Sequence, residues 1–201
     1  DKCKYVFLAI KPQVFDSVLP KLADHVKEDT VVVSIAAGIT EEYIMKTTKD
    51  KVHTVIVMPN TPFLLGEGAT ALAKGTYTTD EEFEVVKSIF STGGIAEVVP
   101  MEKMKEIIAI NGSSPAFIYL YAKGFIDYAK ENGIDGDAAL RLFAKSLIGS
   151  AKMMTESGKT IDELIKMVSS PGGTTLAGLD GLYQGKLTDV VKDCCERCTK
   201  R

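Results

Sequence analysis

Apolar residues follow two different patterns along the chain. In the first hundred residues, short apolar runs alternate with segments whose apolar residues recur at helical spacing. The runs lie at residues 5–10, 30–35 and 52–58, and two weaker ones lie at 69–73 and 95–99. A continuous apolar run of this length is typical of a parallel strand buried on both faces. Its alternation with helices predicts βαβ units in a parallel sheet.

The polar residues between these runs mark where helices begin. Thr40 is a candidate N-cap for a short helix that reaches Met45. Thr79 and Glu82 have the spacing of a capping box, in which each side chain bonds the other residue's backbone N–H. We therefore expect a helix to begin directly after Thr79. Another helix is expected between the first two runs, where one apolar face recurs at Val14, Val18, Leu22 and Val26.

After Pro100 the strand pattern stops and only helical spacing remains. Helices are expected at residues 101–110, 117–129 and 137–157, then in two segments within 160–184, and at 188–201. Thr160 and Glu163 form a second capping box. The segment 111–115 should break the helical path, and Pro115 suits the first turn of the next helix. The sequence thus predicts an α/β domain over residues 1–100 and an all-α domain over residues 101–201.

The segment 117–129 is apolar around nearly its whole circumference. A helix of this kind is normally buried. A helical domain of about a hundred residues offers little cover, so a second subunit is the simplest one. We expect a homodimer or a higher homo-oligomer, with a central helix inside one monomer as the alternative.

Composition narrows the class of function. The formal net charge is −3, which gives no support for nucleic-acid binding. No run of about eighteen apolar residues predicts a membrane span, and the first residues have no signal-peptide pattern. Hydrophobic residues make up 45% of the chain, enough for a core.

Cysteine and histidine give no metal-binding pattern. Three of the four cysteines crowd the last helix, and the paired spacing of a zinc site is absent. The two histidines, His25 and His53, lie far from them in sequence. We expect no metal, and reduced thiols in a cytoplasmic protein. The cysteines are Cys3, Cys194, Cys195 and Cys198.

Three loops follow the first three strands. They read Ala-Ile-Lys-Pro at 9–12, Ile-Ala-Ala-Gly at 35–38 and Met-Pro-Asn-Thr-Pro at 58–62. In open α/β sheets, ligands bind beyond the carboxyl ends of the strands. Small residues there would let a flat ligand approach the backbone. The loops are either part of such a site or ordinary connections.

The most specific stretch is residues 167–182, which connects two helices through Ser-Ser-Pro-Gly-Gly-Thr-Thr. Pro171 disfavours a helical conformation at Ser170, and two glycines let the backbone turn. Thr174 and Thr175 stand where the next helix would present unpaired N–H groups, a favourable place for an anion. On the residues alone, simple capping of the helix by these hydroxyl groups is the favoured interpretation.

This stretch and the three loops, in the same order along the chain, resemble the pyrroline-5-carboxylate reductase family. The resemblance implies an α/β domain followed by an all-α one, namely an incomplete Rossmann-type parallel sheet and a helical dimerisation and substrate domain. It implies that the substrate carboxylate is bound by Ser170, Gly173, Thr174 and Thr175. It also implies nicotinamide dinucleotide contacts at Ala9, Ile10, Lys11, Pro12, Ile35, Ala36 and Ala37, with Asn60 near the nicotinamide end.

The activity implied by the resemblance is reduction of the C=N bond of 1-pyrroline-5-carboxylate to L-proline, the last step of proline biosynthesis. The hydride would come from NADPH, with NADH possible, since the residues that normally separate the two cofactors are not in this chain. No nucleophile and base form a recognisable pattern. No residue is singled out as a general acid.

The chain departs from the family pattern at three points. Ile56 stands where the family commonly has arginine, and Asn111 and Ser114 alter the family's Ser-Gly-Ser-Gly-Pro. A G-x-G-x-x-G turn, which holds the pyrophosphate in dinucleotide folds, is missing. Our hypothesis is a reductase short by roughly sixty residues, the length of two βα units.

Two other classes fit part of the pattern. A β-hydroxyacid dehydrogenase would need a catalytic lysine in the helical half, where Lys123 is available without a matching motif. A non-catalytic helical scaffold that has lost its cofactor site would also lack the glycine-rich turn. Cofactor binding separates the scaffold from the reductases.

Overall fold

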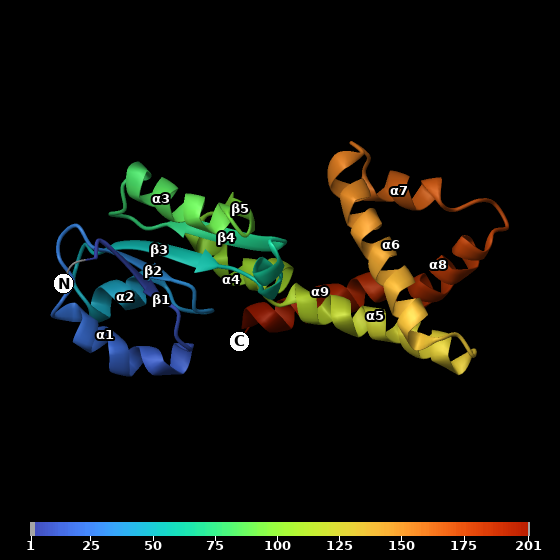
Figure 1. The fold of residues 1–201 in the computed structure, drawn as a ribbon, viewed down its shortest axis with the longest axis horizontal. Coiled ribbons are helices and arrows are strands. Elements are labelled where there is room, and N and C mark those ends of the chain that lie inside the picture. The colour runs from blue at the N-terminus through green and yellow to red at the C-terminus, as the bar shows by residue number, and fades with distance from the viewer. Residues whose placement is uncertain (1–2, 201) are drawn as a thin grey trace. The chain divides into compact units, whose positions relative to one another are not determined.

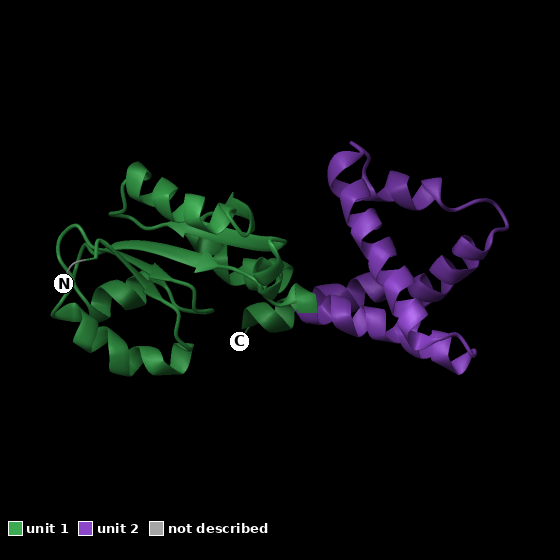
Figure 2. Cartoon of the chain, viewed as in Figure 1, with its two compact units in different colours: residues 1–115, 195–201 green, residues 116–194 purple. Residues whose placement is uncertain are grey.

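The computed structural model describes residues 3–200 and divides the chain into two compact units (Figure 2). The first unit runs up to Pro115 and includes the last turns of the chain from Cys195 on. The second unit is Ala116–Cys194. Strands occur only in the first unit of the described residues, whereas the second is helical.

The first unit is built on a five-stranded sheet in the order β1-β2-β3-β4-β5. Strands β1, β2 and β3 are parallel, β4 is antiparallel to β3, and β5 is parallel to β4. Each strand lies within two residues of an apolar run in the sequence. The strands are β1 Tyr5–Leu8, β2 Val31–Ser34, β3 His53–Met58, β4 Gly68–Lys74 and β5 Gly94–Val98.

The reversal at β4 departs from the wholly parallel sheet expected from sequence. The connection from β3 to β4 contains only a short 3-10 helix, η2 Thr61–Leu65. A parallel return needs a crossover of a dozen or more residues, so this short connection turns the chain back antiparallel. The next connection carries α3 Asp80–Ser91, and β5 accordingly pairs in parallel with β4.

Helices cover both faces of the sheet, with α3 on one face and α1 and α2 on the other (Figure 1). Successive residues of β3 alternate between the two layers: Val55 and Val57 pack with α3, whereas Ile56 and Met58 pack with the opposite layer. This explains why the strands are apolar throughout. The opposite layer includes α1 Phe15–Ala23 and α2 Glu41–Thr47, and η1 Pro12–Val14 precedes it.

Both predicted capping boxes are confirmed, at Thr79–Glu82 and Thr160–Glu163, and Thr40 caps α2. The single helix expected at 101–110 is instead three short pieces: η3 Met101–Lys103, α4 Met104–Ile107 and the π-helix η4 Ile108–Gly112. The break expected at 111–115 is reduced to one bend at Ser113. The π-helix places Asn111 against the sheet, as described below.

The second unit has very little core of its own. Among its described residues only Ala129 is buried. On α5, Tyr119 and Leu120 are 63% and 71% exposed. The expected burial of this helix is therefore not met within one chain. The helices are α5 Ser114–Glu131, α6 Gly136–Glu156, α7 Ile161–Met167, α8 Thr174–Gln184 and α9 Leu187–Lys200.

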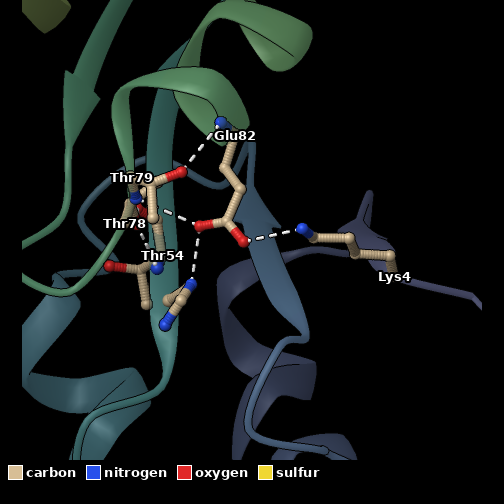
Figure 3. Close-up of polar contacts among 6 residues, drawn as sticks. Lys4, Thr54, Thr78, Thr79 and Glu82 are labelled. Carbon is tan, nitrogen blue, oxygen red and sulfur yellow. Dashed lines mark hydrogen bonds and ion pairs between the residues drawn. The ribbon is translucent and has the colours of Figure 1, made fainter.

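One buried carboxylate connects α3 to the sheet. Glu82 accepts a hydrogen bond from the Thr79 backbone N–H at 3.0 Å and pairs with Lys4 Nζ at 3.0 Å (Figure 3). Its other close partner is His53 Nδ1, at 2.6 Å. Burial raises the pKa of Glu82, but the bonds from Thr79, Lys4 and His53 outweigh it, so the pKa lies below its ordinary value of 4.5.

Because this pKa is lowered in the folded state, the ionised Glu82 stabilises the fold above pH 4.5, and that stability is lost as the pH falls through the lowered pKa. We expect Glu82→Gln to lower the free energy of unfolding by about 1–3 kcal/mol at neutral pH. The variant should also lose less stability than the wild type on acidification. Thermal unfolding at neutral and acid pH measures both effects. Glu81→Gln, at an exposed neighbour, is the control, and equal acid sensitivity of Glu82→Gln and wild type would contradict the assignment.

Candidate functional site

The loops predicted to bind the cofactor lie at one edge of the sheet. Leu8 pairs with Ser34 and Ser34 with Ile56, so the three parallel strands end close to one row. The segments 9–12, 35–37 and 58–60 therefore leave the sheet side by side. All eight predicted cofactor residues belong to the first unit.

Small side chains leave the backbone at this edge accessible. Ala9, Pro12 and Ala37 are exposed, and Ala36 is packed into the core beneath them. Gly38 has a φ of +78°, a conformation that side chains disfavour. A flat dinucleotide could lie against such a surface without displacing bulky groups, so these residues fit that ligand. Lys11 is exposed beside them and offers a positive charge to a phosphate.

An apolar pocket of 380 Å³ adjoins the second of these loops. Its lining includes Ala36, Gly38, Ile56, Met58 and Met104. Ile56 is only 4% exposed and belongs to the hydrophobic cluster on this face of the sheet. An arginine at this position would bring a cation into apolar surroundings. The isoleucine therefore fits its environment, and this strand offers no charged contact at that point.

Asn60 makes its hydrogen bonds within its own chain. Its Oδ1 accepts from the Ala69 N–H at 2.9 Å, and its Nδ2 donates to the Asn111 carbonyl at 3.3 Å. The Asn111 Nδ2 donates in turn to the carbonyls of Met58 at 2.7 Å and Ala69 at 2.9 Å. Sequence reasoning noted Asn111 only as a departure from a family motif and missed this role.

In the part of the chain that the structure describes, only the NH2 group of the Asn111 side-chain amide makes hydrogen bonds. Its Oδ1 is buried and has no hydrogen-bond partner within the described residues. A buried polar atom without a hydrogen-bond partner lowers the stability of the fold by about 1–3 kcal/mol. The two donated bonds and the close packing of η4 offset that cost.

The four residues predicted to hold a carboxylate lie together in the second unit, from the connection after α7 to the first turn of α8. Gly172 has a φ of +69°, and the Gly173 N–H closes the turn on the Ser170 carbonyl at 2.9 Å. Gly173 is the N-cap of α8, with no side-chain cap. Thr174 and Thr175 are exposed in the first turn. We refer to residues 170–175 as the glycine corner.

At the glycine corner no side chain caps α8, so the capping favoured on the residues alone is not found. The first N–H groups of a helix have no partner inside it, and here no serine or threonine hydroxyl satisfies them as a cap. The positive end of the helix dipole adds to their attraction for a negative charge. The exposed hydroxyls of Thr174 and Thr175 supply further donors beside them.

Other candidate chemistry finds no support among the described residues. No cluster of three or more His, Cys, Asp or Glu side chains could hold a metal ion, and no disulfide forms in that part of the chain. Over residues 3–200, no helix combines the length and apolarity needed to cross a membrane. Lys123, the lysine considered for a dehydrogenase, is exposed on α5 and pairs with Asp127.

Two family models match separate parts of the chain. Residues 101–201 match the family model described as pyrroline-5-carboxylate reductase dimerisation, and residues 1–38 match one described as NADP oxidoreductase coenzyme F420-dependent. The pyrroline-5-carboxylate reductase of Methanosarcina acetivorans is 34% identical, over 98% of this chain and 73% of its own length. That of Escherichia coli is 31% identical over the same shares.

Solved structures agree with these matches. The crystal structure of Plasmodium falciparum pyrroline carboxylate reductase with NADP bound superposes with a TM-score of 0.93 at 27% identity, over 98% of this chain and 75% of the other. The reductase from Streptococcus pyogenes gives a TM-score of 0.93 at 29% identity, over 100% of this chain and 76% of the other.

The Rossmann-type sheet, the helical unit that follows it and the match to an NADP oxidoreductase model together place the chain among the nicotinamide-dependent oxidoreductases. The expected fold class is thereby confirmed. Within that class the relatives, the dimerisation model and the structures converge on one family. The chain belongs to the pyrroline-5-carboxylate reductases.

The backbone of the glycine corner can be tested with a matched pair of glycines. Gly172 and Gly158 have φ values of +69° and +70°, and an added Cβ would meet nothing within 4 Å at either position. Replacement by alanine should therefore cost each variant about 1–2 kcal/mol through backbone strain alone. Only Gly172→Ala should also weaken binding of L-proline. Thermal unfolding and proline titration measure the two effects, and equal proline affinity in both variants would refute a role for the corner's shape.

Proposed function

We propose that this chain reduces the C=N bond of 1-pyrroline-5-carboxylate to give L-proline, with NADPH as the preferred hydride donor and NADH as a possible one. The observation that carries the proposal is the N-terminus of α8, which has no side-chain cap and presents two exposed threonine hydroxyls. Such a group of donors suits a small carboxylate. Membership of the reductase family supports the reaction.

In this proposal the glycine corner binds and orients the substrate. Ser170, Gly173, Thr174 and Thr175 hold the carboxylate through hydroxyl and backbone N–H donors. Because the carboxylate is attached to the ring, holding it restricts where the C=N carbon points. Fixing that direction is a large part of what a protein contributes to a hydride transfer.

The carboxyl edge of the sheet binds the cofactor. Ala9, Ile10, Pro12 and the segment 35–37 provide a backbone surface, and Lys11 neutralises phosphate charge. Asn60 holds the end of β3 where the nicotinamide is expected. The bound cofactor supplies the hydride.

The imine accepts a hydride readily once its nitrogen is protonated, so strong acid–base chemistry is not required of the chain. Its residues orient the two reactants and exclude water. In the proposed division of labour, residues 1–100 belong to the dinucleotide-binding domain and residues 101–201 bind substrate and form the oligomer. We also propose a cytoplasmic location.

Oligomerisation follows from the surface of the second unit. Large apolar side chains lie exposed along its helices, and almost none of its residues is buried. An exposed apolar surface of this kind marks an interface. The dimerisation model matched by residues 101–201 supports a homo-oligomer formed through these helices.

The role of the carboxylate donors can be tested with Thr175→Ala. Loss of one hydrogen bond to a charged group corresponds to about 1.5–3 kcal/mol. We expect the KM for the substrate to rise roughly tenfold to a hundredfold, while the affinity for NADPH stays unchanged. Thr188→Ala is the control, because Thr188 is the second residue of α9 as Thr175 is of α8. Unchanged KM and kcat in Thr175→Ala would contradict the proposal.

The interface can be tested with Leu120→Arg. Leu120 is 71% exposed on α5 within a single chain, and a buried arginine there would be strongly unfavourable in an oligomer. We expect dissociation or loss of solubility, measured by light scattering after size-exclusion chromatography. Ile89→Arg, at an exposed position of α3, should leave the subunit number unchanged. A Leu120→Arg variant with the wild-type mass would place the interface elsewhere.

A further inference from the structure

Asn111 lies where two strands of the sheet part. The antiparallel ladder between β3 and β4 ends at the pair Met58 and Ala71. Beyond that pair the two strands diverge towards η2. Their facing backbone groups no longer form hydrogen bonds with each other. The Asn111 side chain fills this gap by donating to the Met58 carbonyl at 2.7 Å and to the Ala69 carbonyl at 2.9 Å.

Asn60 completes a closed ring of hydrogen bonds. Its Oδ1 accepts from the Ala69 N–H, and its Nδ2 donates to the backbone carbonyl of Asn111. Asn111 thus donates to Ala69 and accepts from Asn60. The ring fixes the Asn60 side chain between β4 and η4, two residues after the end of β3.

The residue type matters for this arrangement. An asparagine amide carries two N–H donors on one planar group, and Asn111 uses them on two carbonyls that belong to different strands. A serine hydroxyl has one donor and a shorter reach, and an aspartate has none when ionised. The unpartnered Oδ1 indicates that the side chain acts here as a donor only.

The backbone around Asn111 is packed closely against the same strand end. A Cβ added at Gly112 would lie 3.2 Å from the Met58 sulfur, tighter than an ordinary contact. Asn111 is itself only 8% exposed. The π-helix therefore lies directly against the end of β3, and the two donated bonds hold the Asn111 amide there.

We propose that Asn111 is a positioning residue of the reductase. It holds Asn60 and the carboxyl end of β3 in the conformation that receives the nicotinamide end of the cofactor. The inference rests on the proposed function, which gives Asn60 its place in the cofactor site. Asn111 acts through Asn60 and the β3 backbone and touches neither reactant.

The test compares Asn111→Ser with a matched control in the full-length enzyme. Thr78→Val is the control, because the Thr78 hydroxyl bridges the N–H and carbonyl of Thr54 at 2.8 and 2.6 Å near the opposite end of β3. Both variants lose buried hydrogen bonds to β3, so both should lower the unfolding temperature. Only Asn111→Ser should weaken NADPH binding, by about tenfold, as measured by fluorescence titration without substrate.

A double-mutant cycle shows whether Asn111 acts through Asn60. In an Asn60→Ala background, Asn111→Ser should weaken NADPH binding by a smaller factor than in the wild-type background, because one of the two groups it positions, Asn60, is already gone and only the β3 backbone remains. Fully additive losses of affinity would overturn the inference. So would an Asn111→Ser variant that keeps the wild-type affinity and kcat while losing as much thermal stability as Thr78→Val.

The two proposals fail in distinguishable ways. A full-length wild-type enzyme that neither binds NADPH nor reduces the imine would refute the proposed function, and with it the role of Asn111. A wild-type enzyme that does both, combined with Asn111→Ser behaving like Thr78→Val in every assay, would refute the positioning role alone.

Discussion

The parallel pairing of β1, β2 and β3 is the constraint on which the site depends. Parallel strands in one register end together, so the three loops that follow them meet at one edge whatever their side chains are. Because β4 runs antiparallel to β3, it starts at that same edge, where Ala69 lies within reach of Asn60 and Asn111. A wholly parallel sheet would have carried this segment to the other end and left the end of β3 without these partners.

The helical unit, in contrast to the sheet, is defined by local hydrogen bonds and has almost no core of its own. Its helices have well-formed ends, such as the capping box of α7, but they bury almost nothing against one another. Local hydrogen bonds therefore define the glycine corner, while the stability of the helices around it has to come from contacts with another copy. The proposed substrate site therefore depends on oligomerisation, because the corner keeps its position only as long as α7 and α8 are held.

The strands and the starts of helices were predicted well, because they are determined by residues close together in the sequence. Apolar runs located all five strands to within two residues, and Thr79 and Thr160 located the starts of two helices. The direction of β4 was missed, although the short stretch between β3 and β4 left no room for a crossover helix. The bonds of Asn111 could not have been read from the sequence, because they join residues more than forty positions apart. In the sequence, Asn111 was distinguished only by its departure from the family's Ser-Gly-Ser-Gly-Pro motif.

The hydrogen bonds of Asn60 limit what this predicted site residue can offer to a ligand. From the sequence it is a donor and acceptor free to meet a ligand. In the structure its Oδ1 accepts one bond from Ala69 and one N–H of its amide is directed at Asn111, which leaves one N–H and one lone pair of Oδ1 for anything else. The surface proposed for the cofactor is therefore mainly backbone at the ends of three strands. Its shape is set by residues behind it, and for β3 those residues are the two asparagines.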